Sequence, residues 1–238
     1  MAYIDVHSHI LPGVDDGARS INESLQLISK LKKQGVTRIL ATPHFYASVC
    51  SLEDTVKKAQ ESYADLKMFL TNADPQIKIG YEVHYFKNIS KIDDIEKLTI
   101  DGTRFLLLEL AHMPSLEPAA EDIISLVLDR HITPILAHIE RFALLPGFDR
   151  ITETIKDGFS IGQINASAFS LNRKSKKIAL GLIKEGYGQI IASDTHSVNS
   201  RPPEFDNAFK IIGKKLGEDT VKKIMAENNI LSEKIFKR

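Results

Sequence analysis

The residues best suited to chemistry stand near the start of the sequence, in the run Tyr-Ile-Asp-Val-His-Ser-His that ends at residue 9. A short apolar segment leads into His7 and His9, and Asp15 and Asp16 follow in a glycine-rich turn. Residues two apart on a strand face the same side of a sheet, so both imidazoles point the same way. Imidazoles beside carboxylates are a donor set for a divalent metal ion. This run therefore predicts a metal site at a strand end.

Similar side chains recur at the ends of the other predicted strands. They are His44, Glu82, His84, Glu109, His138, Glu140, Arg141, Asn165, Asp194 and His196. In α/β barrels and open α/β sheets, functional groups collect at the carboxyl ends of the strands. Each residue alone has a simpler explanation, since a lone histidine can be an ordinary polar residue and a buried Glu109 could pair with an arginine. Together they favour a site that binds more than one metal ion.

The donor types narrow the choice of metal. A tetrahedral ion takes about four ligands and an octahedral ion about six including water, so these residues would serve two or three ions. Imidazole and carboxylate without thiolate suit manganese, iron or zinc rather than calcium or a soft metal.

The elements that would position these residues alternate along the chain between short apolar runs and longer amphipathic ones. The predicted strands are Tyr3–His7, Thr37–Ala41, Ile77–Val83, Phe105–Leu110, Thr133–Ala137, Ser160–Ile164 and Gln189–Ala192. The predicted helices are Ser20–Lys33, Leu52–Leu70, Ala119–Asp129, Arg150–Lys156, Ser170–Glu185, Glu204–Lys215 and Glu218–Glu227. This alternation predicts an α/β fold with parallel strands, and seven strands in succession favour an irregular barrel.

Length and composition limit the possible domain number, binding partners and location of the protein. The 238 residues suit a single domain, residues 1–238, in which Lys plus Arg equals Asp plus Glu at 31 each. A neutral chain gives no overall sign of nucleic-acid binding. The one cysteine, Cys50, suits a reducing compartment. No signal peptide and no apolar run long enough for a membrane span are evident, so we expect a cytoplasmic protein without membrane insertion.

As a set, these motifs resemble those of the polymerase and histidinol phosphatase (PHP) superfamily. The matching runs are His7-Ser8-His9-Ile10, Asp15-Asp16-Gly17, Thr42-Pro43-His44, Glu82, Glu109, His138-Ile139-Glu140-Arg141 and Ser193-Asp194-Thr195-His196. Within that superfamily, the chain is similar to the bacterial tyrosine-protein phosphatases of capsule and exopolysaccharide operons. The resemblance covers almost the whole chain, with the motifs in the expected order. His-x-His alone would be a weak signal, because other metallohydrolases also begin with it.

The resemblance implies a distorted seven-stranded (β/α) barrel of TIM type with three divalent metal ions, usually manganese. The ligands it implies are His7, His9, Asp16, His44, Glu82, Glu109, His138, Asp194 and His196. It also implies that Arg141 and Arg201 hold the substrate phosphate and that Glu82 bridges two ions. Ile139 replaces the proline usual in the family, a change that could relax the loop carrying Arg141. His84 is outside the implied ligand set and could line the rim or bond a phosphate oxygen.

We therefore expect metal-assisted hydrolysis of a phosphate monoester, in which bound cations activate water and neutralise phosphoryl oxygens. Cys50 lacks the Cys-x5-Arg loop of cysteine phosphatases, so we interpret it as structural. Phe45, Tyr46 and Phe142 stand beside predicted site residues, where they could contact a substrate tyrosine or merely pack the rim.

The resemblance favours phosphotyrosine protein as substrate, with a bacterial tyrosine kinase that controls polysaccharide export as the implied partner. Hydrolysis of histidinol phosphate or another small phosphate ester is the first alternative. A metal-dependent nuclease or amidohydrolase is weaker, because the chain shows no basic stripe and no lysine at a strand end. A non-catalytic metal-binding module is the alternative of another class. The Lys/Glu-rich segment of roughly 204–237 could form an oligomer contact.

Overall fold

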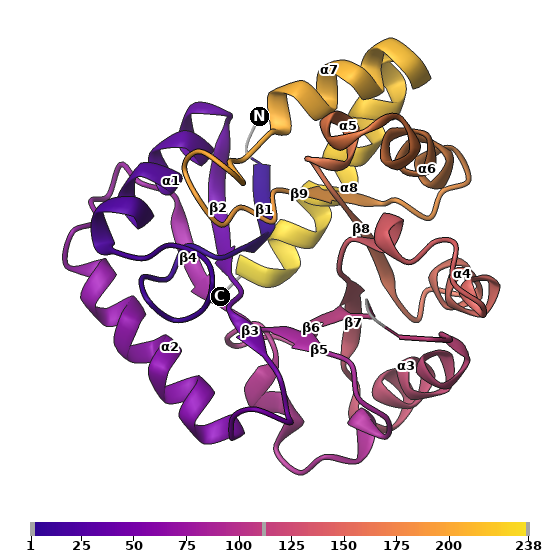
Figure 1. The fold of residues 1–238 in the computed structure, drawn as a ribbon, viewed down its shortest axis with the longest axis horizontal. Helices are drawn as coiled ribbons and strands as arrows, with labels where there is room; N and C mark the ends of the chain where they lie inside the picture. Colours follow the sequence, from indigo (N-terminus) through magenta and orange to yellow (C-terminus); the bar gives the residue numbers. More distant parts are fainter. Residues whose placement is uncertain (1–2, 111–112, 237–238) are drawn as a thin grey trace.

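A computed structural model describes residues 3–110 and 113–236 of the chain (Figure 1). Its strands are β1 (Tyr3–Ser8), β2 (Val36–Ala41), β3 (His44–Phe45), β4 (Gln76–Ile79), β5 (Glu82–His84), β6 (Phe105–Glu109), β7 (Thr133–Leu136), β8 (Ile161–Asn165) and β9 (Ile190–Ala192). Helices of the chain surround these strands, so the fold is α/β as predicted.

The strands of the described residues pair in parallel and form two sheets. The smaller sheet has the order β1-β2-β4, and the larger has the order β3-β5-β6-β7-β8-β9. Backbone hydrogen bonds link the sheets near their carboxyl ends: the amide of Asp194 donates to the His7 carbonyl at 2.8 Å, and that of His9 to the Thr195 carbonyl at 2.9 Å. The end of β1 therefore lies beside the segment that follows β9.

The helices lie between successive strands and around them (Figure 1). They are α1 (Ile21–Lys33), α2 (Leu52–Lys67), α3 (Glu117–Arg130), α4 (Phe148–Lys156), α5 (Ala168–Leu171), α6 (Arg173–Lys184), α7 (Phe205–Leu216) and α8 (Glu218–Phe236), with short 3₁₀ turns at Ile89–Lys91, Ile95–Leu98 and Ile139–Arg141. Ser20 caps α1, because its side chain accepts a hydrogen bond from the amide of Glu23. Leu27, Ile28 and Leu31 then bury one face of that helix, as the apolar spacing predicts.

Three sequence predictions were wrong in detail. The predicted strand Ile77–Val83 is two strands, β4 and β5, in different sheets. The predicted helix Ser170–Glu185 is two helices, because Asn172 is extended and caps α6 by accepting from the amide of Ser175. The last helix continues to Phe236, well past the predicted end at Glu227. The break between β4 and β5 and the end of α8 lie at contacts with distant segments, which local periodicity does not reveal, whereas the Asn172 cap is a local feature that the prediction missed.

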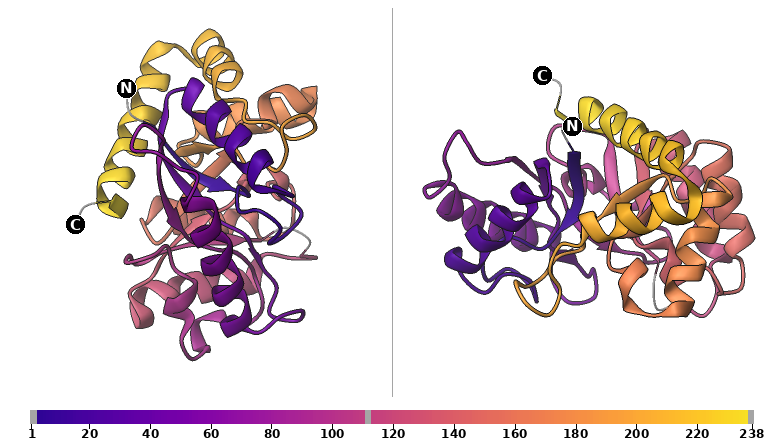
Figure 2. Two further views of the ribbon diagram at one scale, coloured as in Figure 1. Left: turned by 90° about the vertical axis from the view of Figure 1, so that its left-hand side faces the viewer. Right: turned by 90° about the horizontal axis from the view of Figure 1, so that it is seen from above.

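The helix α8 covers the amino-terminal end of β1. In both views of Figure 2, α8 lies on one side of the molecule, and the loops after β1 and β9 extend on the opposite side. Ile4 and Val6 of β1 join Leu231 and Ile235 of α8 in a small apolar core separate from the larger one beneath the other helices. None of the helices in the described residues combines the length and the apolar character that a membrane crossing needs.

Candidate metal centre

The structure brings the nine predicted ligands together at the carboxyl ends of the strands. They are His7 in β1, His9 after it, Asp16 in the next loop, His44 in β3, Glu82 in β5, Glu109 in β6, His138 after β7, and Asp194 and His196 after β9. All except Asp16 and His44 are buried. Both sheets therefore contribute ligands to one cluster.

Glu82 lies at the centre of the cluster. Its Oε2 is 3.2 Å from Nε2 of both His7 and His9 and 2.9 Å from Nδ1 of His44. Its Oε1 is 2.9 Å from Nε2 of His138. One carboxylate thus contacts four imidazoles that come from both sheets, which is a suitable position for a ligand shared between ions.

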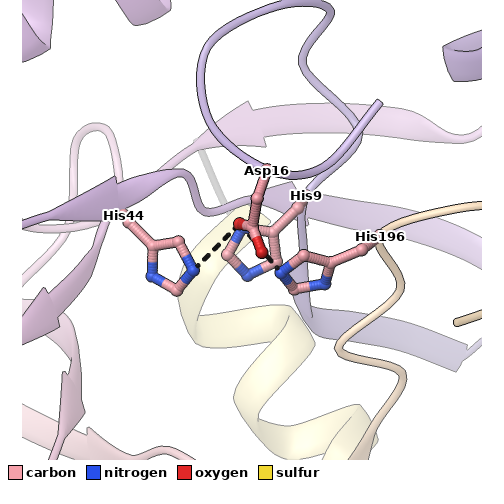
Figure 3. Close-up of side chains that lie close together, drawn as sticks. All are labelled: His9, Asp16, His44 and His196. Carbon is pink, nitrogen blue, oxygen red and sulfur yellow. Dashed lines mark ion pairs between the residues drawn. The ribbon is translucent and has the colours of Figure 1, made fainter. Parts of the chain in front are cut away.

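Asp16 reaches the cluster from the exposed side (Figure 3). Its Oδ1 lies 3.3 Å from Nε2 of His44 and 3.4 Å from Nε2 of His196. The ring of His196 stacks on that of His9 at a centroid distance of 3.8 Å. The Asp16 side chain is 63% exposed, so this part of the cluster is open to solvent.

Asp194 joins the buried imidazoles to the two predicted phosphate-binding arginines. Its Oδ1 lies 3.5 Å from His7 Nε2 and 3.6 Å from His9 Nε2. Its Oδ2 is 2.5 Å from Nη2 of Arg141 and 3.0 Å from Nη2 of Arg201. The arginine side chains are 42% and 41% exposed, so guanidinium groups border the cluster on its solvent side.

Two ligand positions have a left-handed backbone. His138 has φ 35° and Asp194 has φ 50°, and each stands two residues after the last residue of its strand. Side chains other than glycine adopt this region at a cost of about 1 kcal/mol or more, and such strain collects at functional sites. At each of these positions the chain turns sharply after the strand, and the side chain enters the cluster.

Asp15 orients two of the imidazole residues, a role that the sequence did not assign to it. Its Oδ2 lies 2.7 Å from Nδ1 of His9 and accepts a hydrogen bond from the backbone amide of His44 at 3.1 Å. Gly17 permits this fold of the loop, because a Cβ there would lie 2.2 Å from the carbonyl oxygen of His9. Metal-binding histidines typically donate a hydrogen bond to a carboxylate from the ring nitrogen that does not bind the metal.

A buried amide pair supports the opposite side of the cluster. Gln163 Oε1 lies 3.3 Å from His7 Nδ1 and accepts from the backbone amide of His138 at 2.8 Å. Gln163 donates in turn to Asn165 Oδ1 at 2.9 Å, and Asn165 donates to Asp194 Oδ2 at 2.7 Å. Asn165 could be noted from the sequence as a strand end, whereas Gln163 was missed. Its only signal is an amide inside an otherwise apolar strand.

The electrostatics of the cluster favour bound cations. Burial opposes ionisation of Glu82, but the surrounding imidazoles outweigh it and hold the pKa of that carboxyl well below its usual value. Burial and the neighbouring His9 lower the pKa of His196 to about 3. Burial disfavours the charged form of His9, yet Asp15 and Glu82 raise its pKa to about 10. Metal binding to His9 would therefore release a proton.

Within residues 3–110 and 113–236, three groups of side chains could each hold a metal ion, because their ligand atoms lie within 4.8 Å of one another. The groups are His9, Asp16, His44 and His196; His7, His9 and Asp194; and His44, Glu82 and Glu109. His138 borders the third group, with Nε2 3.4 Å from Glu109 Oε1.

The remaining sequence candidates lie around the cluster. His84 Nδ1 is 3.2 Å from Glu109 Oε2, at the partly exposed rim. Ile139, Phe45 and Phe142 are buried in the larger apolar core, so they pack the site from behind. Tyr46 differs from the two phenylalanines, because it lines a cavity beside His44.

Comparison with known proteins shows the family of the chain. Residues 3–235 match the family described as "Capsular polysaccharide synthesis, CpsB/CapC". The tyrosine-protein phosphatase CpsB of Streptococcus agalactiae serotype V is 31% identical over 237 residues, which cover 94% of this chain and 96% of that protein. The tyrosine-protein phosphatase YwqE of Bacillus subtilis is 24% identical and covers 91% of this chain and 86% of its own.

The fold has a solved counterpart. It comes from work on YwqE from Bacillus subtilis and CpsB from Streptococcus pneumoniae, described as metal-dependent tyrosine phosphatases. The match has a TM-score of 0.78 at 23% identity and covers 97% of this chain and 94% of the other. On the family match and the relatives together, this chain belongs to the CpsB/CapC family of capsular polysaccharide synthesis.

Proposed function

We propose that the protein is a metal-dependent protein-tyrosine phosphatase that hydrolyses phosphotyrosine monoesters. The observation that carries this proposal is the meeting of imidazoles and carboxylates from both sheets in one cluster, with two arginines at its exposed edge. The names of the relatives, tyrosine-protein phosphatases over nearly their whole length, support the substrate class.

The residues present fit divalent cations. His7 Nε2 and His9 Nε2 lie 3.1 Å apart, a separation that needs either a shared proton or a nearby cation. Among the described residues, the buried atom His196 Nε2 makes no hydrogen bond, while Nδ1 of the same ring lies 3.0 Å from the Asp194 carbonyl oxygen. Unpaired buried polar atoms are costly, and ligation of imidazoles would remove part of that cost.

We assign nine residues as ligands to three ions. They are His7, His9, Asp16, His44, Glu82, Glu109, His138, Asp194 and His196, with Glu82 as the bridging carboxylate. Manganese is the metal that the resemblance favours, and iron or zinc would use the same donors. When bound, such ions lower the pKa of a water toward about 7 and offset the charge of phosphoryl oxygens.

The arginines supply the substrate contacts in this proposal. Arg141 and Arg201 both reach Asp194 from solvent, so each can turn a guanidinium fork toward non-bridging phosphate oxygens without leaving the site. Asp15, Gln163 and Asn165 keep the imidazoles and Asp194 in place, which preserves the geometry during turnover.

The proposal extends to the domain organisation, the barrel and the biological setting of the protein. We infer that residues 1–238 form one domain and that the two sheets together form the distorted seven-stranded barrel of the PHP type, with β2 and β3 counted as one interrupted strand and β4 and β5 as another. A cytoplasmic location, a bacterial tyrosine kinase as substrate and an oligomer through residues 204–237 stay predictions.

The decisive experiment is an assay of the manganese-reconstituted protein on a phosphotyrosine peptide, the matching phosphoserine peptide and histidinol phosphate, each with a chelator control. Faster turnover of the phosphotyrosine peptide supports the proposal. Preference for histidinol phosphate would assign the same chemistry to the small-molecule alternative. Less than one bound metal per chain together with no turnover would leave the non-catalytic module as the function.

A further inference from the structure

A cavity of about 460 Å³ opens directly beside the metal cluster, between the loop after β1, the loop after β3 and the start of α2. Asp16 and His44 belong both to its lining and to the candidate ligands. The cavity is therefore within reach of the ester group of a phosphate held at this part of the cluster. A cavity of this size is in the range that binds small organic groups.

Tyr46 lines the cavity next to the candidate ligand His44. It follows β3 directly, and residues two apart face the same side, so its ring lies on the side of His44 at a centroid distance of 5.3 Å. On its other side it contacts the ring of His84, also at 5.3 Å. The Tyr46 ring is thus fixed between two imidazoles at the junction of cavity and cluster.

The segment after Tyr46 makes the cavity a preformed feature. The backbone amides of Val49 and Cys50 donate to the Tyr46 carbonyl at 2.9 and 3.2 Å, and the Cys50 thiol lies 3.6 Å from the same oxygen. Thr55 Oγ1 donates to Cys50 Sγ at 3.1 Å. Val49, held at the tip of this turn, is 79% exposed and adds an apolar side chain to the lining.

The charges around the cavity select what can enter it. Asp15, Asp16 and Asp54 belong to its lining, and the one lysine there, Lys58, donates through Nζ to the Val14 carbonyl at 2.6 Å. Carboxylates repel a second phosphate or an acidic side chain, whereas they tolerate an uncharged ring. The apolar and aromatic lining then favours an aryl group over the short methylene of phosphoserine.

We propose that this cavity seats the phenol ring of the substrate phosphotyrosine and that Tyr46 is a specificity-determining residue for aryl over alkyl phosphates. The inference rests on the proposed phosphatase function and adds a location for the leaving group. The phosphoryl group lies at the arginines and ligands, and the ring extends along Tyr46 toward Val49.

The test compares the wild type with Tyr46→Ala, Tyr46→Phe and Val49→Asp, all reconstituted with manganese. Calorimetry measures Kd for phenylphosphonate and methylphosphonate, and kinetics measure kcat/KM on a phosphotyrosine peptide. We expect Tyr46→Ala to weaken phenylphosphonate binding and kcat/KM by about 10-fold and to leave methylphosphonate within about twofold. Tyr46→Phe keeps the ring and stays within about twofold of wild type for both probes. Val49→Asp weakens phenylphosphonate in the same direction.

Met68→Ala is the matched control. Like Val49, Met68 is a large exposed apolar residue, 75% exposed, but it stands just beyond the carboxyl end of α2. Equal loss for both phosphonates in Tyr46→Ala, or no preference for phenylphosphonate in the wild type, overturns this inference. A wild type that hydrolyses phosphotyrosine while Tyr46→Ala matches it also overturns the inference but leaves the phosphatase function intact. A manganese-loaded wild type that hydrolyses no phosphate ester refutes the function itself.

Discussion

The two ends of β1 bury polar groups in opposite ways. At the amino-terminal end, Asn228 of α8 is fully buried, accepts from the amide of Ile4 at 3.0 Å and donates to the carbonyl of the same residue at 2.9 Å. At the carboxyl end, His7 and His9 contact other ring nitrogens and carboxylates. The first arrangement is complete within the chain, whereas the second leaves charge and lone pairs to be balanced by bound cations. Asn228, whose partners lie within the chain, therefore serves stability, whereas His7 and His9 serve binding.

Removal of the metal ions should have the largest effect, and it should act at the carboxyl end of β1 rather than at the amino-terminal end. A chelator should reduce phosphatase turnover by about 10³-fold or more, because activation of water and neutralisation of the phosphate are lost together. Restoring manganese should return turnover and raise the unfolding temperature, since the ions bind only the folded cluster. Assays and thermal melts on the same sample provide both readings. Full turnover in chelator would show that the imidazole cluster is not a metal site.

Glu82→Gln tests the centre of the cluster. The change keeps the size of the side chain but removes the charge that contacts four imidazoles, so we expect a loss of about 10³-fold in turnover and fewer metal ions per chain. Elemental analysis and kinetics measure the two effects. Glu153→Gln is the control, because that glutamate is exposed on α4. A variant with unchanged metal content would remove Glu82 from the ligand set.

Arg141→Ala tests the exposed edge of the same end. Loss of one donor to the phosphoryl oxygens should reduce turnover by about 10²–10³-fold while the metal content stays constant. Arg150→Ala, a change at an exposed surface arginine paired with Glu153, should leave both quantities unchanged. If Arg141→Ala instead lost metal, the arginine would act by holding Asp194 rather than the substrate.

Asn228→Ala tests the other end. It leaves the buried amide and carbonyl of Ile4 without partners, so we expect the free energy of unfolding to fall by about 2–3 kcal/mol. Turnover per folded, metal-loaded molecule should stay near that of wild type. Asn229→Ala, next to it on α8 but exposed, is the matched control for denaturant unfolding curves. A strong loss of turnover in Asn228→Ala without loss of stability would contradict the division between the ends.

Much of this arrangement could be predicted from the sequence, for a physical reason. The motif residues stand at strand ends, and parallel strands bring their carboxyl ends to one edge, so local patterns were enough to bring His7, Glu82 and Asp194 together. The break between β4 and β5 was not predictable, because the backbone there bonds to a distant segment: the amide of Gly80 donates to the Ala41 carbonyl at 2.9 Å and that of Glu82 to the Pro43 carbonyl at 3.0 Å. Periodicity within one segment carries no information about that distant neighbour.

The roles of the residues that orient the candidate ligands could likewise not be predicted from the sequence. Asp15 and Asp16 are adjacent and chemically identical, and only the folded loop decides that one orients His9 while the other faces His44 and His196. Nothing in the sequence around Gln163 reveals its contact with His7, which is 156 residues away. Candidate ligands follow from residue type and strand ends, and the family resemblance narrows them to nine, whereas the contacts that orient these side chains follow from the tertiary structure.

The pairing of β1 with the chain after β9 has a consequence for biosynthesis. Asp5 of β1 accepts from Ser193, which the ribosome adds 188 residues later. Until that partner emerges, the strand that carries His7 and His9 lacks one of its neighbours, and long-range parallel pairing forms slowly. A nascent chain interrupted before residue 190 would therefore leave His7 and His9 beside Glu82 but without Asp194, the acid that the segment after β9 contributes to the cluster.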